Sequence, residues 1–278
     1  MDKNSTKYQV ESSPAIKATT ASYGENYILT MGGVLNIYGN CSKQEVEQAI
    51  HESPKWGISL IQFARKFEVN IELLTVLNER VLTKFPDCSL RQVLNGYGAF
   101  VNLEFLRHLN HLTDLRIELF GEVDLAPINK YCKLKHLAIG GDKSRIGEIA
   151  KHKSIENLFV FDKIKDVHLI GGMENVRQLT ISKMTLKNLD FLRGLVNLKE
   201  LHFMLGGTKN LEALPEIGKI EKLSFTWVRQ LEIENLEVIN RMNYLQELSF
   251  DRQAHLTDLN WLKKSGLKVE VTNCKNYT

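Results

Sequence analysis

The chain has 278 residues, of which 43% are apolar and 25% are charged, and it contains only 5 Pro. This composition excludes a collagen, a disordered chain and a small disulfide-stabilised scaffold, because the chain has enough apolar residues for a large core. The 36 Lys and Arg residues exceed the 33 Asp and Glu residues by a net charge of +3, which is too small and too dispersed for a protein that binds nucleic acid mainly through phosphates.

The amino-terminal segment is polar and lacks the apolar stretch of a secretory signal peptide. No stretch of the chain approaches the roughly 18 consecutive apolar residues of a transmembrane helix. We therefore expect residues 1–22 to form a disordered tail, and we expect a cytoplasmic protein with no membrane partner.

The next segment predicts a β-hairpin. Two apolar stretches, residues 27–31 and 34–38, flank the turn-forming pair Gly32 and Gly33. Residues 35–40, Leu-x-Ile-x-x-Asn, also fit a unit of the repeat described below. The sequence alone does not decide between a hairpin and an outlying repeat unit.

Three helices are predicted between residues 43 and 85. Ser42 and Glu45 form a capping box that begins the first helix, which ends at Ser53-Pro54. The second helix is expected over residues 59–67 and the third over residues 71–85, with Asn70 as its N-cap.

Part of this region, residues 57–78, resembles the helical part of the LysM module, a glycan-binding family. The positions that carry this resemblance are Gly57, Leu60, Phe63, Ala64, Val69, Leu74 and Asn78. Leu60, Ala64 and Val69 also resemble a DNA-binding helix-turn-helix, although Glu68 occupies the position of its turn Gly. An ordinary helical cap is the favoured interpretation of these apolar positions.

The second part of the chain is repetitive. The pattern apolar-x-x-apolar-x-apolar occurs eight times, and its middle residues are 22, 21, 21, 22, 22, 25 and 21 residues apart. These middle residues are Leu115, Leu137, Leu158, Leu179, Leu201, Leu223, Leu248 and Val269. Between the units the apolar spacing changes to three or four, which indicates a short strand followed by a helical or 3-10 return segment.

Over residues 100–273 the pattern resembles the leucine-rich repeat family. The resemblance implies an α/β solenoid with a curved parallel β-sheet, a helical and 3-10 convex side and, here, an N-terminal α+β cap. We expect the cap over residues 23–99 and the repeat domain, of about eight repeats, over residues 100–278. The family's Asn after the strand is missing, so we expect an irregular solenoid; its position holds Phe120, Asp142, Lys163, Met184, Gly206, Val228 and Gln253.

The residues between the inward-pointing apolar positions must project from the concave side of the sheet. They include an apolar and aromatic group in the middle of the array with charged residues on either side, which is the layout of a protein interface. The candidate binding residues are Arg116, Phe159, Phe161, His202, Met204, Thr226, Trp227, Asp251 and Arg252. Trp227 has the alternative of packing beneath the loop that follows its strand.

Signals for catalysis or metal binding are missing from the sequence. The four Cys have no metal-ligand or disulfide spacing, so we expect reduced thiols, no metal and no cofactor. We therefore predict a non-enzymatic protein that recognises another protein through its concave face. The resemblance implies a bacterial adaptor or toxin-neutralising immunity protein, and the alternative is an exported, LysM-like carbohydrate-binding protein.

Overall fold

The computed structural model describes residues 27–39, 41–52, 57–63, 70–94, 102–130, 133–141, 145–208, 210–229 and 231–277. The expected disordered tail, residues 1–22, lies outside the described residues. Within the described part of the chain, no helix is both long enough and apolar enough to span a bilayer.

The predicted hairpin is present, and its second strand has two roles. Strand β1 (Tyr27–Met31) pairs antiparallel with β2 (Val34–Tyr38) across Gly32 and Gly33, which both have positive φ. Strand β2 also pairs in parallel with β3 (Leu60–Phe63). Both alternatives for this segment are therefore correct: β2 is the first parallel strand of the repeat sheet, and β1 covers its free edge.

Two of the three predicted helices are confirmed, and the prediction over residues 59–67 is wrong for its described part, residues 59–63. Helix α1 (Lys43–His51) begins with the expected capping box, and α2 (Ile71–Val76) begins at its Asn70 cap and continues into the π-helix η1 (Leu77–Leu82). Residues 60–63 form β3 instead. Their spacing fits a helix, but backbone pairing with strands on both sides favours the strand, so the LysM-like match lacks its first helix.

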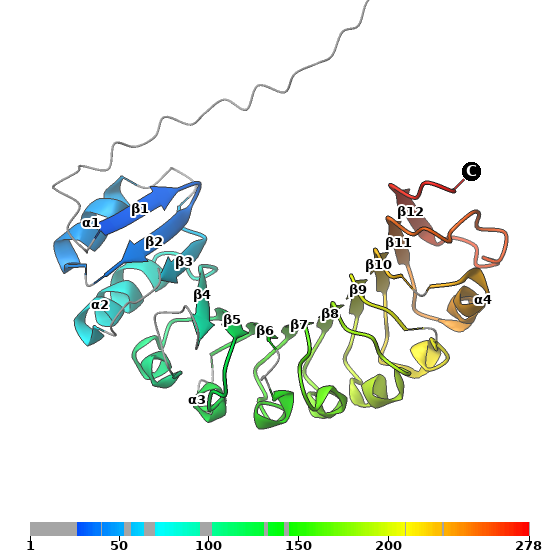
Figure 1. Ribbon diagram of the computed structural model, residues 1–278, viewed down its shortest axis with the longest axis horizontal. Coiled ribbons are helices and arrows are strands. Elements are labelled where there is room, and N and C mark those ends of the chain that lie inside the picture. The colour runs from blue at the N-terminus through cyan, green and yellow to red at the C-terminus, as the bar shows by residue number, and fades with distance from the viewer. Residues whose placement is uncertain are drawn as a thin grey trace, which may run out of the picture.

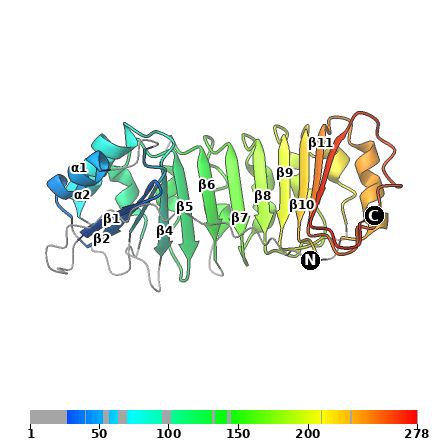
Figure 2. The ribbon, with the colours of Figure 1, turned by 90° about the horizontal axis from the view of Figure 1, so that it is seen from above.

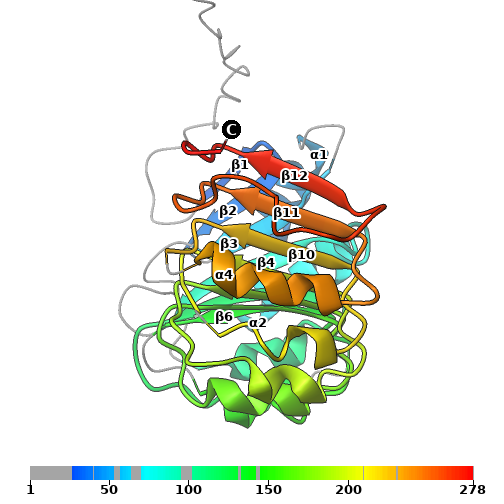
Figure 3. The same cartoon turned by 90° about the vertical axis from the view of Figure 1, so that its right-hand side faces the viewer.

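All twelve strands form one sheet in sequence order, and the strands from β2 to β12 are all parallel to one another. The later strands are β4 (Ser89–Leu94), β5 (Asp114–Leu119), β6 (His136–Gly140), β7 (Asn157–Phe161), β8 (Gln178–Ser182), β9 (Glu200–Met204), β10 (Lys222–Thr226), β11 (Glu247–Asp251) and β12 (Lys268–Thr272). Figures 1 and 2 show an arch in which the strands lie side by side along the inner, concave side. Figure 3 shows β12 as the last strand of the sheet.

The pairing register aligns the middle residue of each repeat with that of the next. It also reveals three further units, whose middle residues Leu35, Ile61 and Leu90 are paired in series with Leu115. These three units are 26, 29 and 25 residues long. The predicted domain boundary at residues 99 and 100 lies outside the described residues, but β4 and β5 on either side of it are paired, so one sheet continues through both regions.

The convex side consists of short helical segments, as expected (Figure 1). They are η2 (Glu104–His108), α3 (Ala126–Asn129), η3 (Ile146–Glu148), η4 (Val167–Gly172), η5 (Asp190–Gly194), η6 (Leu214–Glu216), α4 (Ile233–Leu236) and η7 (Glu237–Arg241). Each unit buries its apolar residues only against its neighbours, which is the structural basis of a solenoid.

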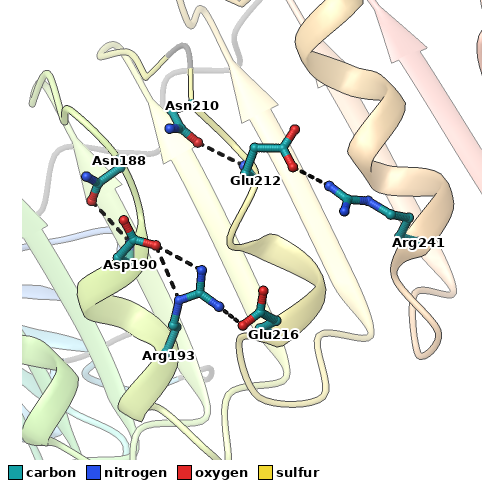
Figure 4. Close-up of polar contacts among 7 residues, drawn as sticks. All are labelled: Asn188, Asp190, Arg193, Asn210, Glu212, Glu216 and Arg241. Atoms are coloured by element: carbon teal, nitrogen blue, oxygen red, sulfur yellow. Dashed lines mark hydrogen bonds and ion pairs between the residues drawn. The ribbon is translucent and has the colours of Figure 1, made fainter.

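Polar contacts on the convex side connect neighbouring units (Figure 4). The backbone N–H of Asp190 donates to the side chain of Asn188 at the start of η5. Arg193 then pairs with Asp190 at 2.9 Å and with Glu216 of the next unit. Arg241 pairs with Glu212 in the same way, so these convex-side arginines have their partners within the chain.

The core of the last units is aromatic. The rings of Phe203, Phe225 and Phe250 stack in series at centroid distances of 5.5 and 5.6 Å, and Trp261 meets the last ring edge-on. Beside this stack, buried Gln253 donates from its side-chain amide to the backbone carbonyls of Phe225 and Asp251. Gln253 thus makes between units the kind of bond expected of the missing Asn.

Candidate binding surface on the concave face

The side chains of the concave face follow from strand alternation. The second and fourth residues of β7, β9 and β11 are the apolar positions of the repeat pattern, and they point into the core. The residues between them point to the open side of the sheet, which gives the alternating burial of these strands. The predicted binding residues lie on this side or directly after its strands: Arg116 on β5, Phe159 and Phe161 on β7, His202 and Met204 on β9, Thr226 on β10 with Trp227 after it, and Asp251 on β11 with Arg252 after it.

A pocket of about 630 Å³ opens on this face over β3 to β8. Small residues of β6 create it, because Ala138 and Gly140 face the open side where neighbouring strands carry larger side chains. The ring of Phe161 lies across Gly140, where a Cβ would be only 2.2 Å from the ring. Gly140 therefore sets the position of Phe161, which lines the pocket together with Phe159.

The two phenylalanines form a single apolar patch. Their ring centroids are 5.7 Å apart and tilted by 54°, and both side chains are partly exposed. Their backbone alternates with buried Leu158 and Val160, so neither ring can turn into the core without reversing the register of β7. The patch is therefore available for contact with a partner.

Charged residues lie along the amino-terminal side of this pocket as ion pairs. Arg91 pairs with Glu118 at 2.7 Å, and Arg116 pairs with Asp114 at 3.2 Å. These pairs are exposed, so each contributes little to stability, on the order of 0–1 kcal/mol. They border the apolar patch on this side with groups that can exchange partners on binding.

In seven successive units, the first residue after the strand has a left-handed backbone conformation. These residues are Gly141, Asp162, Lys183, Leu205, Trp227, Arg252 and Asn273, with φ between 50° and 113°. Gly and Asn adopt this conformation at little cost, whereas for other residues it costs about 1–2 kcal/mol. We call these positions the strand-exit column.

Two adjacent members of the strand-exit column are large and apolar. Leu205 is 39% exposed and Trp227 is 47% exposed, and they lie next to Met204 and Thr226. The alternative in which Trp227 is buried beneath its loop is wrong. Sequence reasoning missed Leu205, although its place four residues after Leu201, which matches that of Trp227 after Leu223, could have identified it.

His202 belongs to a polar cluster on the same face. Its Nδ1 is hydrogen-bonded to Ser224 Oγ at 2.5 Å, and its Nε2 is 3.6 Å from a carboxylate oxygen of Glu200. Glu200 also accepts from Gln178 and pairs with Lys222. Burial lowers the pKa of His202, and Glu200 partly opposes that shift, so the imidazole is neutral at pH 7.

Asp251 does not join His202. It accepts hydrogen bonds from the side chains of Asn273 and Thr272, and the bond from Asn273 is the main reason that its pKa is lowered. The Ser224, His202 and Glu200 side chains resemble a hydrolase triad in residue type. However, none of the three lines the pocket over β7, and a triad needs a pocket with donors for an oxyanion beside its nucleophile.

The described residues contain no group of three or more His, Cys, Asp and Glu side chains that could hold a metal ion. Cys41, Cys88 and Cys274 are free thiols, and Cys132 lies outside the described residues. Burial raises the pKa of both Cys41 and Cys88 to about 12, so these two thiols are protonated and unreactive at neutral pH.

Solved structures with a similar fold are internalins of Listeria monocytogenes. An internalin (inlF) is 17% identical over 77% of this chain and 67% of its own, with a TM-score of 0.49. Internalin C2 (inlC2) is 19% identical over 73% of this chain and 90% of its own, with a TM-score of 0.50. No protein-family model matches the sequence, and a search of curated proteins gives no significant match.

Internalin C2 is a leucine-rich-repeat protein, and the long open parallel sheet of this chain fits that fold. The predicted fold, an α/β leucine-rich-repeat solenoid, is therefore confirmed. At this level of identity the likeness concerns the fold alone.

Proposed function

We propose that the protein is a non-enzymatic recognition protein that binds one protein partner on its concave face. The observation that carries this proposal is a set of partly exposed apolar side chains on the concave side or directly after its strands: Phe159, Phe161, Met204, Leu205 and Trp227. Monomeric proteins rarely leave such a group uncovered, and aromatic residues with a charged surround are typical of interface centres.

An adaptor and a toxin-neutralising immunity protein both need a rigid surface of this kind. The sheet supplies the rigidity, because every strand from β2 to β11 has a hydrogen-bonded neighbour on both sides and the inward apolar residues of β5 to β11 are buried. A preorganised surface loses little conformational entropy on binding, which favours a tight complex.

The test is an affinity capture from the cytosol of the source cells. The intact protein is compared with a Phe161→Asp, Met204→Asp double variant whose fold is verified by circular dichroism and thermal unfolding. We expect the intact protein to retain one protein in stoichiometric amount and the double variant to lose it.

A matched control places two charges on the convex side, at the exposed residues Leu169 and Val196. The Leu169→Asp, Val196→Asp variant should retain the partner. Retention of the same partner by the concave-face variant would contradict the proposal, as would its loss from the convex-side control alone.

A further inference from the structure

A second hollow lies at the opposite ends of the strands from the strand-exit column. Its volume is about 580 Å³, and it lies along the turns that lead into β5 to β9. Its charged lining consists of Lys133, Lys135, Lys153, Arg177 and one carboxylate, Glu156. We call it the basic groove.

The four cations of the basic groove are exposed, and among the described residues none of them has an ion-pair partner. Several cations elsewhere on the described surface do have ion-pair partners. Arg193 and Arg241 on the convex side have partners (Figure 4), and so does Lys199, which follows Arg177 in the next unit and pairs with Glu221 at 2.8 Å. The positive charge of the groove is therefore not balanced within the described chain.

The backbone holds these side chains in a fixed row. The N–H of Glu156 donates to the carbonyl of Lys135 at 2.9 Å, and the N–H of Arg177 donates to the carbonyl of Glu156 at 2.7 Å. Lys135, Glu156 and Arg177 thus occupy equivalent positions in three successive units, directly before β6, β7 and β8. With strands about 4.8 Å apart, the two cations of this row are separated by roughly 10 Å at their backbone.

Polar side chains of the groove stiffen the turns that carry the other cations. Asn175 donates from its side-chain amide to the carbonyl of Lys153 at 2.7 Å, and Asn197 donates to the carbonyl of Glu174 at 2.9 Å. Ser154 donates from its hydroxyl to the carbonyl of Leu134 at 2.8 Å. The groove is therefore built by regular contacts between units, and the backbone positions that carry its cations are held at fixed spacing.

We propose that the basic groove is a second binding site, separate from the concave face, that takes an acidic segment of a protein partner. Carboxylates are the groups that Lys and Arg side chains pair with most readily in proteins, and an extended acidic segment places carboxylates at intervals that match a row of cations. Its binding removes the mutual repulsion of four uncompensated cations.

A protein segment fits the groove better than a nucleic acid. The volume suits a few residues of peptide, whereas a nucleic acid needs a long positive track along its phosphates. The net charge of the whole chain is only +3, and Glu156 lies within the row where it would face the phosphates. The Glu156 carboxylate also predicts a preference for segments with spaced rather than continuous acidic residues.

The test uses a fluorescein-labelled peptide of alternating Glu and Ser residues, with a Gln and Ser peptide of equal length as the neutral probe. Binding to the full chain is measured by fluorescence anisotropy at low ionic strength. We expect binding of the acidic peptide and none of the neutral one. A Lys133→Gln, Lys135→Gln, Arg177→Gln variant should weaken binding at least about tenfold, since exposed pairs each contribute up to about 1 kcal/mol.

Two control variants make the result specific. Arg107→Gln, Arg193→Gln, Arg241→Gln lowers the net charge by the same amount at convex-side residues that already have partners, so binding should stay within about twofold of the unsubstituted chain. Glu156→Gln removes the single carboxylate of the groove, and binding should become about two- to fivefold tighter.

The proposal is overturned if both triple variants weaken binding equally, because the effect then reflects net charge alone. Tighter binding of a single-stranded oligonucleotide of equal charge than of the acidic peptide would assign the groove to nucleic acid instead. The Phe161→Asp, Met204→Asp variant should bind the peptide normally, so failure of the groove proposal and failure of the concave-face proposal are separate results.

Discussion

Positive φ recurs in all seven units of the strand-exit column, but only Leu205 and Trp227 combine it with a large apolar side chain. Both have positive φ, which costs a non-Gly residue about 1–2 kcal/mol, and both expose a large apolar side chain. Other units place Gly141 or Asn273 at the same position. Strain that coincides with an exposed apolar group is typical of functional sites, where binding rather than stability selects the residue.

We therefore expect Leu205→Asn and Trp227→Asn to leave stability nearly unchanged while partner binding weakens at least tenfold. Asn accepts the left-handed backbone, and this gain offsets the loss of packing around a half-exposed side chain, so the free energy of unfolding should change by less than about 1 kcal/mol. Urea unfolding and the capture experiment measure the two quantities. A destabilisation of about 3 kcal/mol or more, as expected for a core change such as Phe225→Ala, would place these side chains in the core.

Gln92 is a buried polar residue at a position of β4 that points into the core. It is 1% exposed, and neither atom of its side-chain amide has a hydrogen-bond partner among the described residues. It is paired with Ile117, whose position in the other units is apolar. Leaving a buried amide without a partner costs about 1–3 kcal/mol.

Gln92→Leu should therefore raise the free energy of unfolding by about 1–3 kcal/mol. The leucine fills a similar volume and needs no hydrogen bond, so we expect a higher urea midpoint with an unchanged m-value. A lower midpoint would mean that the amide is satisfied in solution and that its polar character stabilises β4.

At the scale of elements, the His202 cluster connects β9 and β10 and makes the sheet sensitive to pH. The folded-state pKa of His202 lies below its usual value of 6.5, so the unfolded chain binds this proton more readily than the folded chain. The contribution of neutral His202 to the free energy of unfolding is fully present above pH 6.5. This contribution is lost as the pH falls toward the lower folded-state pKa.

Stability should consequently decrease between about pH 7.5 and 5.5, and His202→Gln should remove part of that decrease. Thermal unfolding of both proteins at the two pH values gives the comparison, with the exposed His168→Gln as the matched control. An equal pH dependence in the unsubstituted chain and in His202→Gln would contradict the assignment.

The sequence contains enough information for the regular strands but not for the irregular ones. From Leu115 to Val269 the repeat spacing varies only between 21 and 25 residues, and each of these units forms a strand in the predicted register. The first three units are up to 29 residues long, and β4 has Gln92 where an apolar residue is expected, so their periodicity is hidden. Ile58, Ile61 and Phe63 do fit the pattern, but Leu60 and Phe63 also fit a helix, and only pairing with β2 and β4 distinguishes the two.

The sequence likewise predicts some features of the molecular surface and not others. Strand alternation alone places Phe159, Phe161, His202 and Met204 on the open side, because the pattern of each unit determines which residues point inward. The pocket could not be predicted, since it depends on Gly140 lying beneath the ring of a neighbouring unit. The basic groove was missed because its cations come from three different units and the net charge of the chain is small.

At the scale of the whole molecule, stability is the sum of contacts between neighbouring units. The two ends of the sheet differ, because β1 covers β2 whereas the side chains of β12 are exposed or only partly buried. We expect backbone amides of β12 to exchange with solvent at least tenfold faster than those of β7 and β8, measured by hydrogen–deuterium exchange. Equal protection along the array would indicate that the solenoid opens as a single unit or that β12 is covered in solution.

The central claim is that the concave face binds a protein, and site-specific photo-crosslinking in the source cells tests it most directly. One variant carries a photoreactive phenylalanine at Thr180 on β8, between Phe159 and His202, and a second carries it at exposed His168 on the convex side. We predict a crosslink to one protein from position 180 and none to that protein from position 168. A crosslink from position 168 without one from position 180 would contradict the account.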